Sequence, residues 1–487
     1  MSVVATGTVA QSTQRGKPSG PKWEDLSQNP RNWSKSRKLC TLCLVSFQAF
    51  TSPFASSVIA PGLPEISKKF DVKSDSVQAL VLTVYLLGWA FGPLAFGPLS
   101  EMHGRRRVLN ISGLIFVAFS IGCIFCRSIS ELIAFRFLAG IGASTPISIA
   151  GAVIADMYEL SDRAPANAIY GFGLLIGPPT GPVIGGYLTQ TVGVKYCFVL
   201  ASCLVAVGFC LGLLFLPETH HDIIQATRQR HPVQLWFVKP RSDDELNISD
   251  TEQSTSFTKE ENSVRKSVFM PIILLLRSPV CLLISLYGAF VYALLNVFFT
   301  IFPTVFGDIY GFSPGTVGLS YIGGGLGEIL ATIVSGWLGN TVYHRLVKKN
   351  NDVHKPEFRI PGVLLGSVAV PVGLFWFGWS ATAGVHWIMP IIGSSIFGFG
   401  LMSILLPLQL YTIDAFRNAA SALAASALAR SLLAFAIPLF TPQMISAMGL
   451  RGTFSLLGGL SIVVGLPLPI WIFYKGESFR AAGNFGN

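Results

Sequence analysis

Long apolar segments fill most of this chain, and they constrain its fold more than any other feature of the sequence. Each comes close to the roughly 20 residues that a helix needs to cross the hydrocarbon core of a bilayer. Six precede a polar stretch near the middle of the chain, and six follow it. The predicted spans are residues 39–61, 76–99, 108–126, 130–155, 166–190, 196–216, 279–303, 314–339, 361–382, 386–411, 418–440 and 453–474. The sequence therefore predicts an all-α integral membrane protein with twelve transmembrane helices.

The overall composition supports this prediction. Of the 487 residues, 51% are hydrophobic and only 12% are charged, whereas about 25% of the residues in soluble domains are charged. Twelve spans of roughly 20 residues need about 240 apolar residues, and 51% of 487 is about 248. A soluble enzyme is therefore disfavoured, and neither a G-x-S-x-G nucleophile motif nor a His-rich cluster indicates a membrane enzyme.

The eight cysteines lie in or beside apolar segments, and they include two C-x-x-C pairs, Cys40 with Cys43 and Cys123 with Cys126. No cluster of His or Cys in a polar segment completes a zinc site with them. We interpret them as thiols that act as small apolar residues. The sequence predicts no metal and no cofactor.

Lysine and arginine are distributed unevenly between the two sides of the predicted bundle. If the N-terminus is cytoplasmic, the segments on that side hold 27 of the 35 Lys and Arg residues, the segments on the other side hold 6, and Arg136 and Arg430 fall within spans. The positive-inside rule then predicts that both termini are cytoplasmic. This distribution accounts for the net charge of +10 without a nucleic-acid partner.

Polarity divides the chain into five predicted parts. They are a cytoplasmic N-terminal tail (1–38), a six-helix half (39–216), a cytoplasmic central loop (217–269), a second six-helix half (270–474) and a cytoplasmic C-terminal tail (475–487). Two six-span halves predict a duplicated architecture with a substrate site between them, near the bilayer midplane. No G-x-x-x-x-G-K-[ST] motif is present, so a carrier driven by a gradient is favoured over one driven by ATP.

A charged loop joins the second and third predicted spans, Gly97-Pro-Leu-Ser-Glu101-Met-His-Gly104-Arg105-Arg106-Arg107. The chain must reverse here, which suits Gly104. An acid at the end of a span, such as Glu101, is costly unless it is paired. The alternative to a pairing role is that the three arginines merely anchor the loop at lipid headgroups.

This loop closely resembles motif A, G-x-x-x-D-x-x-G-R-R, of the major facilitator superfamily, and specifically of its fungal twelve-span drug:proton antiporters, with Glu101 in place of Asp. The resemblance implies that Glu101 faces the N-terminus of the eleventh helix when the carrier is open outward, where a carboxylate is stabilised by about 0.3–1 kcal/mol. It also implies that Arg105 pairs with Glu101 and with Asp156. The implied conformational latch consists of Gly97, Glu101, Gly104, Arg105, Arg106 and Asp156.

The second half carries a diverged copy of the same loop. The segment from Gly336 to Arg345 aligns with Gly97 to Arg106, and the acid has become Asn340 and the glycine Tyr343. This supports duplication and predicts that the two halves do not carry equal latches.

The fourth predicted span contains Arg136, followed by Gly140 and Gly142. An arginine inside a span costs several kcal/mol unless it is hydrated or paired. The segment resembles motif B, R-x-x-x-G-x-G, and the resemblance implies that Arg136 takes part in proton transfer by influencing a nearby carboxylate. The alternative is that Arg136 extends its head group to the outer surface.

The fifth predicted span is rich in glycine and proline, which allow close helix approach and bending. Packing alone would account for a glycine-rich face. The order of the residues nevertheless resembles the antiporter motif C, G-x-x-x-G-P-x-x-G-G, with Ala168 where the longer pattern has glycine, and this implies an exporter. The matching residues are Gly177, Pro178, Gly181, Pro182, Gly185 and Gly186.

Polar side chains within spans mark the predicted transport path, because they are costly in the bilayer. Glu328 is the sharpest case: a buried carboxylate is able to carry a proton or bind a cationic substrate, and the alternative is a structural pair with Arg430. The other candidates for lining a substrate cavity, any of which a bond between helices would also explain, are Gln48, Tyr85, Asn296, Tyr321 and Gln409.

These observations predict a monomeric secondary transporter with the major facilitator fold. We expect it to export hydrophobic or amphipathic small molecules, such as drugs, toxins or secondary metabolites, by proton antiport with alternating access. Its predicted partners are a small-molecule substrate, protons and the lipid bilayer, in the plasma membrane. The alternatives are a proton-coupled uptake symporter, a polyamine carrier and a non-transporting membrane receptor of the same fold.

Overall fold

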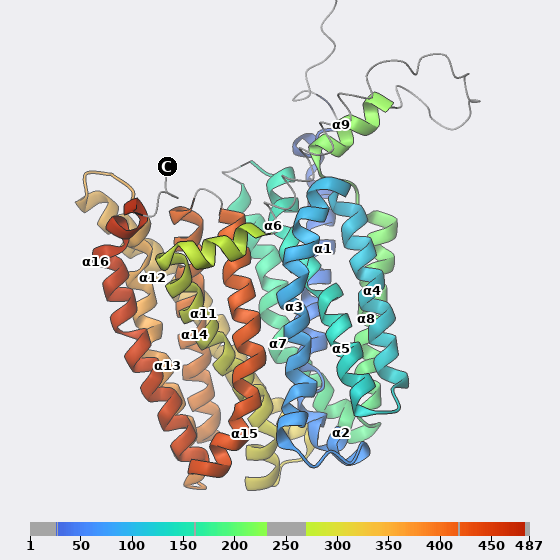
Figure 1. Ribbon diagram of the computed structural model, residues 1–487, viewed down its shortest axis with the longest axis vertical. Helices are drawn as coiled ribbons and strands as arrows, with labels where there is room; N and C mark the ends of the chain where they lie inside the picture. The colour runs from blue at the N-terminus through green and yellow to red at the C-terminus, as the bar shows by residue number, and fades with distance from the viewer. Residues whose placement is uncertain (1–25, 27, 160–161, 231–268, 417–418, 483–487) are drawn as a thin grey trace, which may run out of the picture.

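The computed structural model describes residues 26, 28–159, 162–230, 269–416 and 419–482 as a bundle of long helices, and it contains no strand within those residues (Figure 1). We call the end of the bundle at which α1 begins and α16 ends the terminal face, and the other end the opposite face. The terminal face is at the top of Figure 1, where α9 and the C-terminus lie.

The first half extends from a short 3₁₀ turn, η2 (Pro30–Asn32), to α9. Its helices are α1 (Lys35–Ser57), η3 (Ala60–Gly62), α2 (Leu63–Lys69), α3 (Asp75–His103), α4 (Arg105–Phe125), α5 (Ile129–Ala143), α6 (Thr145–Met157), α7 (Arg163–Thr191), α8 (Lys195–Phe215) and α9 (His221–Arg230).

The second half begins with α11 and ends with α16. Its helices are α11 (Pro279–Phe302), η4 (Pro303–Ile309), α12 (Pro314–Lys349), η5 (Pro356–Arg359), α13 (Pro361–Thr382), α14 (Ile388–Ala415), α15 (Ala419–Gly465) and α16 (Pro467–Ala482).

The prediction of twelve membrane-spanning helices is confirmed. Ten helical runs in the described part of the chain are long and apolar enough to span a bilayer. The last of them, Ala419–Phe479, contains both the eleventh and the twelfth pass, because α15 turns at Gly449. Helix α7 supplies the remaining pass. It falls outside those ten runs, and it carries Pro178, Pro179 and Pro182 within its length.

One predicted span differs from the helices that the structure shows. The fourth is two helices, α5 and α6, which meet at Ser144 just before the Thr145-Pro146 start of α6. The eleventh and twelfth predicted spans correspond to the two arms of α15, of which α16 continues the second, and the arms are separated at Gly449, inside the interval 441–452 that the prediction left between the spans. The φ of Gly449 is 74°, a conformation that favours glycine because it has no Cβ.

The predicted tails and central loop differ from the structure at their edges. Helix α1 begins at Lys35, inside the predicted N-terminal tail, and α16 continues to Ala482, inside the predicted C-terminal tail. Helix α9 occupies His221–Arg230, within the segment that we predicted to be a loop. The remainder of that loop, residues 231–268, and most of the N-terminal tail lie outside the described residues.

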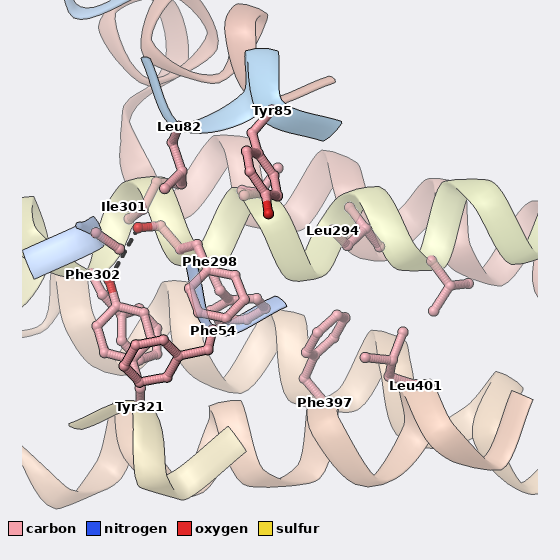
Figure 2. Close-up of a cluster of buried hydrophobic side chains, with 14 of the residues drawn as sticks. Phe54, Leu82, Tyr85, Leu294, Phe298, Ile301, Phe302, Tyr321, Phe397 and Leu401 are labelled. Atoms are coloured by element: carbon pink, nitrogen blue, oxygen red, sulfur yellow. Dashed lines mark hydrogen bonds between the residues drawn. The ribbon is translucent and has the colours of Figure 1, made fainter. Parts of the chain in front are cut away.

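Aromatic side chains form much of the core of the second half (Figure 2). The ring of Phe298 on α11 lies 4.6 Å from the ring of Phe397 on α14 and 4.8 Å from that of Phe377 on α13, measured between centroids. The rings of Phe302 and Tyr321 are 4.5 Å apart, which joins α11 to α12. Ring pairs of this kind stabilise packing by about 0.5–1.5 kcal/mol each beyond the burial of their area.

Two helix pairs make the most extensive contacts between the halves: α7 with α12, and α3 with α15. At the first contact the backbones touch near the opposite face, because both helices present glycine. A Cβ on Gly186 would collide with the carbonyl oxygen of Pro314, and a Cβ on Gly318 would collide with that of Pro182. Small residues permit this approach in a bilayer, where helix association depends on close packing.

This contact yields a testable prediction. Gly318→Ala adds a Cβ that the contact cannot accommodate, and overpacking of this kind costs about 1–3 kcal/mol. We expect the α7–α12 contact to loosen, so that populations with a long distance between the helices increase about tenfold. The measurement is the distance distribution between spin labels at the exposed residues Val192 and Ile309.

Gly339→Ala on the same helix is the matched control, because no atom lies within 4 Å of the Cβ that it adds. If Gly318→Ala and Gly339→Ala give the same distance distribution as the parent, the backbone contact does not hold the halves together.

Candidate functional site

A cavity lies between the two halves. Helices α1, α3 and α7 of the first half and α11 of the second half form its wall. The lining residues are Pro53, Ser56, Ser57, Leu82, Leu86, Trp89, Pro178, Tyr292, Leu295, Asn296 and Phe299. The wall is apolar and aromatic, with a few hydroxyl and amide groups, which is typical of small-molecule sites.

Of the five polar residues predicted to line a cavity, Asn296 lines this one. Its amide nitrogen donates a hydrogen bond to the carbonyl oxygen of Tyr292, one turn earlier on α11, at 3.1 Å. Gln409 is exposed, near the end of α14. The side chains of the other three residues make hydrogen bonds that hold neighbouring helices together.

Each of those three bonds is made to a carbonyl oxygen of a neighbouring helix. The amide nitrogen of Gln48 donates to the carbonyl oxygen of Gly208 on α8 at 3.0 Å. The hydroxyl of Tyr85 donates to the carbonyl oxygen of Ser52, and the hydroxyl of Tyr321 donates to that of Phe299, each at 3.0 Å. Their predicted contact with substrate stays a prediction.

The charged loop between α3 and α4 is organised by an acid from another part of the chain, Glu218. One carboxylate oxygen of Glu218 accepts a hydrogen bond from the backbone N–H of Arg105 at 2.8 Å, and the other accepts one from that of Arg106 at 3.1 Å. Gly104 has a φ of 91°, and a Cβ there would collide with this carboxylate. Glu218 thus caps the N-terminus of α4, where a negative charge is favourable.

The guanidinium of Arg105 extends the same network. Its Nε lies 3.6 Å from Oδ2 of Asp156, at the end of α6, and its Nη1 donates to the hydroxyl of Ser100. The hydroxyl of Thr219 donates to the same Asp156 oxygen at 3.1 Å. The structure therefore brings together Gly104, Arg105 and Asp156 as the motif predicts, and it adds Glu218 and Thr219, which the sequence analysis did not assign.

Glu101 stands apart from this network. It is exposed, and no ion pair or hydrogen bond of its carboxylate is found within the described part of the chain. Gly97 likewise has open space beside it. The predicted contact of Glu101 with the start of α15 is not made in this conformation, in which the backbone contact between the halves lies at the opposite face.

The second half has an equivalent network that the aligned sequence did not locate. Helix α12 continues to Lys349, so that the residues aligned with Arg105 and Arg106 lie inside it. Arg359 in η5, just before α13, takes the role of Arg105. Its Nε lies 3.0 Å from Oδ2 of Asp414 at the end of α14, its Nη1 donates to Oδ1 of Asn340 at 3.3 Å, and its guanidinium stacks on the ring of Tyr343.

Arg136 is 3% exposed and bonds to backbone rather than to a carboxylate. Its guanidinium donates to the carbonyl oxygens of Ser56 at 3.1 Å, Ala55 at 3.4 Å and Leu82 at 3.5 Å, and it lies over the ring of Tyr85. These contacts join α5 to the end of α1 and to α3. The side chain therefore does not extend to the surface, and its predicted role in proton transfer stays a prediction.

The residues of the predicted motif C form the surface of α7 that faces α1. A Cβ on Gly181 would collide with the hydroxyl of Ser57, and one on Gly185 would collide with the carbonyl oxygen of Val58. The next residue, Gly186, contacts α12, and Pro178 lines the cavity. The motif therefore places α7 between the cavity, α1 and the second half.

Glu328 is 3% exposed on α12, which belongs to the pair of helices that joins the halves. Among the described residues its carboxylate makes no ion pair, so the predicted alternative of a pair with Arg430 is not formed in this conformation. Tyr292 of the cavity wall is close enough to interact electrostatically with both groups. An unpaired acid at this depth is costly in its charged form.

Two glutamines form hydrogen bonds between the halves at the opposite face, and we call these two sets of bonds the clasps. The sequence analysis assigned neither glutamine a role. Oε1 of Gln190, at the end of α7, accepts from the backbone N–H of Gly315 at 3.1 Å and from the hydroxyl of Ser313 at 3.0 Å, at the start of α12. The amide of Gln443 on α15 bonds to the hydroxyl of Ser76 at the start of α3. The two clasps occupy equivalent places in the two halves.

One group of residues has the spacing of metal ligands. The ligand atoms of His220, His221 and Asp222, at the start of α9, lie within 4.8 Å of one another. His221 and Asp222 are exposed, and their side chains already pair at 2.8 Å. The cavity wall includes none of the three.

Comparison with known proteins identifies related chains. The family described as Major Facilitator Superfamily matches residues 45–438. "Efflux pump radE" of Floropilus chiversii is 36% identical over 99% of this chain and 88% of its own length. "MFS-type transporter penM" of Penicillium rubens is 35% identical over 95% of this chain and 89% of its own length.

A solved structure shares the fold. The xylose transporter XylE from E. coli, in a partially occluded inward open conformation, aligns with a TM-score of 0.63 at 15% identity and covers 90% of this chain and 98% of its own.

Removal of the Glu218 cap gives a test of the loop network. Glu218→Ala leaves the first N–H groups of α4 without their acceptor, and loss of a helix cap costs about 0.5–2 kcal/mol. We expect a lower unfolding temperature in detergent, measured by tryptophan fluorescence. Glu159→Ala, at an exposed acid outside the network, should leave that temperature unchanged. Equal unfolding temperatures for both variants would contradict the capping role.

The clasps give a second test. Gln190→Leu removes two hydrogen bonds between the halves, each contributing about 0.5–1.5 kcal/mol, so the Val192–Ile309 distance should lengthen in a larger fraction of molecules. Gln443→Leu should add to this effect, because the clasps are separate. Gln78→Leu on α3 is the control. The clasps are refuted if Gln190→Leu and Gln78→Leu give identical distributions.

Proposed function

The chain belongs to the major facilitator superfamily, and we propose that it exports hydrophobic or amphipathic small molecules in exchange for protons. The observation that carries this proposal is the arrangement of α7. The glycine and proline residues that resemble the antiporter motif pack α7 against α1 and α12, directly beside the cavity between the halves. A relative that aligns over nearly the whole chain is named an efflux pump, and this name supports export as the direction of transport.

The chemistry of the cavity supports the class of cargo. Rings from Trp89, Tyr292 and Phe299 and the side chains of three leucines form most of the wall. Such a surface binds apolar bodies through the hydrophobic effect, and Ser56 and Asn296 offer groups that orient a polar substituent.

Glu328 is the group that we assign to proton coupling. It is buried on a helix that takes part in the contact between the halves, so its charge state is able to bias which face is closed. Protonation removes the cost of holding a charge at this depth. Substrate binding and protonation that favour different conformations are thermodynamically coupled, which is what antiport requires.

Sidedness follows from the distribution of basic residues. We assign the terminal face to the cytoplasmic side of the membrane. We also assign the protein to the plasma membrane, as a monomer. The conformation described here, closed at the opposite face, is then the inward-facing one. On opening outward, the halves would approach at the terminal face, where Glu101 would reach the start of α15 and form the latch with Arg105 and Asp156.

The test uses purified protein in sealed vesicles with an imposed pH gradient and fluorescent hydrophobic compounds as cargo. We expect cargo movement opposite to the proton flow that stops when the gradient is collapsed. Glu328→Gln should reduce gradient-driven movement at least about tenfold, in line with the 10²–10⁴-fold effects of losing a positioned proton carrier.

Glu159→Gln, which changes an exposed acid in the same way, serves as the control, and Glu101→Ala tests the latch separately. Cargo movement by the parent protein that does not depend on the pH gradient would refute antiport. Gradient-driven movement that survives in Glu328→Gln would refute the assignment of the coupling acid.

A further inference from the structure

Arg430 is an ionisable side chain inside the spans to which the preceding account gives no role. It lies about three turns into α15, which begins at Ala419, or roughly 16 Å along the helix axis. This depth is about half of a hydrocarbon core that is roughly 30 Å thick. A guanidinium at such a depth is costly unless it is hydrated or paired, and it marks a functional site by default.

The neighbours of Arg430 show that it faces the space between the halves. Its guanidinium carbon lies 5.9 Å from the ring centroid of Tyr292 on α11, a residue of the cavity wall. Tyr170 on α7, in the other half, is within electrostatic reach of the same charge. One turn before Arg430, the hydroxyls of Ser426 and Ser285 are 2.7 Å apart and hold α15 against α11.

Arg430, whose side chain is half-buried, differs from Arg105, Arg136 and Arg359 in having no polar partner among the described residues. Arg105 and Arg359 pair with aspartates, and Arg136 bonds to three carbonyl oxygens. Within the described residues, the guanidinium of Arg430 makes no ion pair and no hydrogen bond. Its remaining contact is the face of an aromatic ring, which stabilises a cation by about 0.5–2 kcal/mol but leaves its five N–H donors free.

We propose that Arg430 binds an anionic group of the cargo, so that the transported class is amphipathic organic anions: an aromatic or conjugated body that carries one carboxylate or comparable oxyanion. This rests on the proposed function, because it assigns the cargo of the same cavity. The body occupies the cavity against Tyr292 and Phe299, and the oxyanion accepts two parallel N–H bonds from the planar guanidinium.

The charges around the cavity favour an anion over a cation. The lining residues include no carboxylate, and Glu328 is not among them. Arg430 is not a lining residue either, and Tyr292 is within electrostatic reach of both Arg430 and Glu328. The guanidinium, however, lies over the ring of Tyr292. A cationic cargo against that ring would be repelled by the guanidinium, because like charges in a medium of low polarity repel strongly. An anion instead supplies the partner that Arg430 lacks.

The test is equilibrium binding to the full chain in nanodiscs of phosphatidylcholine, which carries no net charge. The probes share one fluorophore and differ in charge: dansylglycine is an anion, dansylglycinamide is neutral and dansylcadaverine is a cation. We expect the parent to bind dansylglycine at least about tenfold more tightly than the other two. Arg430→Gln should abolish this preference with little change for the neutral probe, and Arg430→Lys should restore part of it.

Arg451→Gln is the matched control, because Arg451 lies at the opposite face, stacked on the ring of Trp379. A parent that binds dansylglycine no more tightly than dansylglycinamide overturns the proposal, as does Arg430→Gln with equal losses for all three probes. Because binding needs neither a gradient nor a direction, these outcomes are independent of whether proton-driven export is observed in vesicles.

Discussion

A charge inside a bilayer must be given a partner by the protein, and this constraint governs the arrangement of the molecule. Arg136 donates hydrogen bonds to three carbonyl oxygens where α1, α3 and α5 meet. It therefore holds three helices of the first half together. Arg105 and Arg359 form ion pairs with aspartates at the terminal face of each half. Glu328 and Arg430 are left without such partners, and both lie on helices that join the halves. The two charges without such partners thus lie on helices where the halves meet, which is where the proposed coupling requires them.

The duplicated architecture gives these interactions equivalent places. Asp156 lies near the end of α6 as Asp414 lies near the end of α14, and each faces an arginine from earlier in its own half, Arg105 at the start of α4 and Arg359 just before α13. Gln190 and Gln443 close the opposite face on the two sides of the cavity. The halves differ at the terminal face, where Glu101 has Asn340 as its counterpart. In the proposed latch, the side of Asn340 would hold less strongly than the side of Glu101, because a neutral side chain lacks the charge–dipole attraction.

The sequence allowed the spans and the family to be predicted, because both depend on local patterns. Apolar length predicted twelve passes, and the spacing of glycine, proline and arginine predicted which loops and helices carry motifs. The break that was missed lies within an apolar stretch, at Ser144 between α5 and α6. Gln190 escaped the analysis because a glutamine at the end of a span has no distinguishing pattern. Its role depends on a helix more than a hundred residues away. Glu218 had a signal, because it is an acid directly after the sixth span. The sequence did not indicate that it would bond to the backbone N–H groups at the start of α4.

The direction in which a polar side chain points was equally hidden. Gln48, Tyr85 and Tyr321 were predicted from polarity alone, and each makes a hydrogen bond to a carbonyl oxygen of a neighbouring helix. A buried hydroxyl or amide needs a partner in either role, so polarity does not distinguish a cavity wall from a helix contact. Asn296 lines the cavity because this side of α11 forms part of the cavity wall, and only the assembled bundle shows which side that is.

The central claim is that cargo and proton compete through Glu328. It is tested most directly by measuring protons released when cargo binds to the purified protein in weakly buffered solution with a pH-sensitive dye. The account predicts the release of up to about one proton for each molecule bound by the parent and none for Glu328→Gln, because linked sites must respond to each other. Cargo binding that releases no proton from the parent at any pH, or an equal release from both proteins, would contradict it.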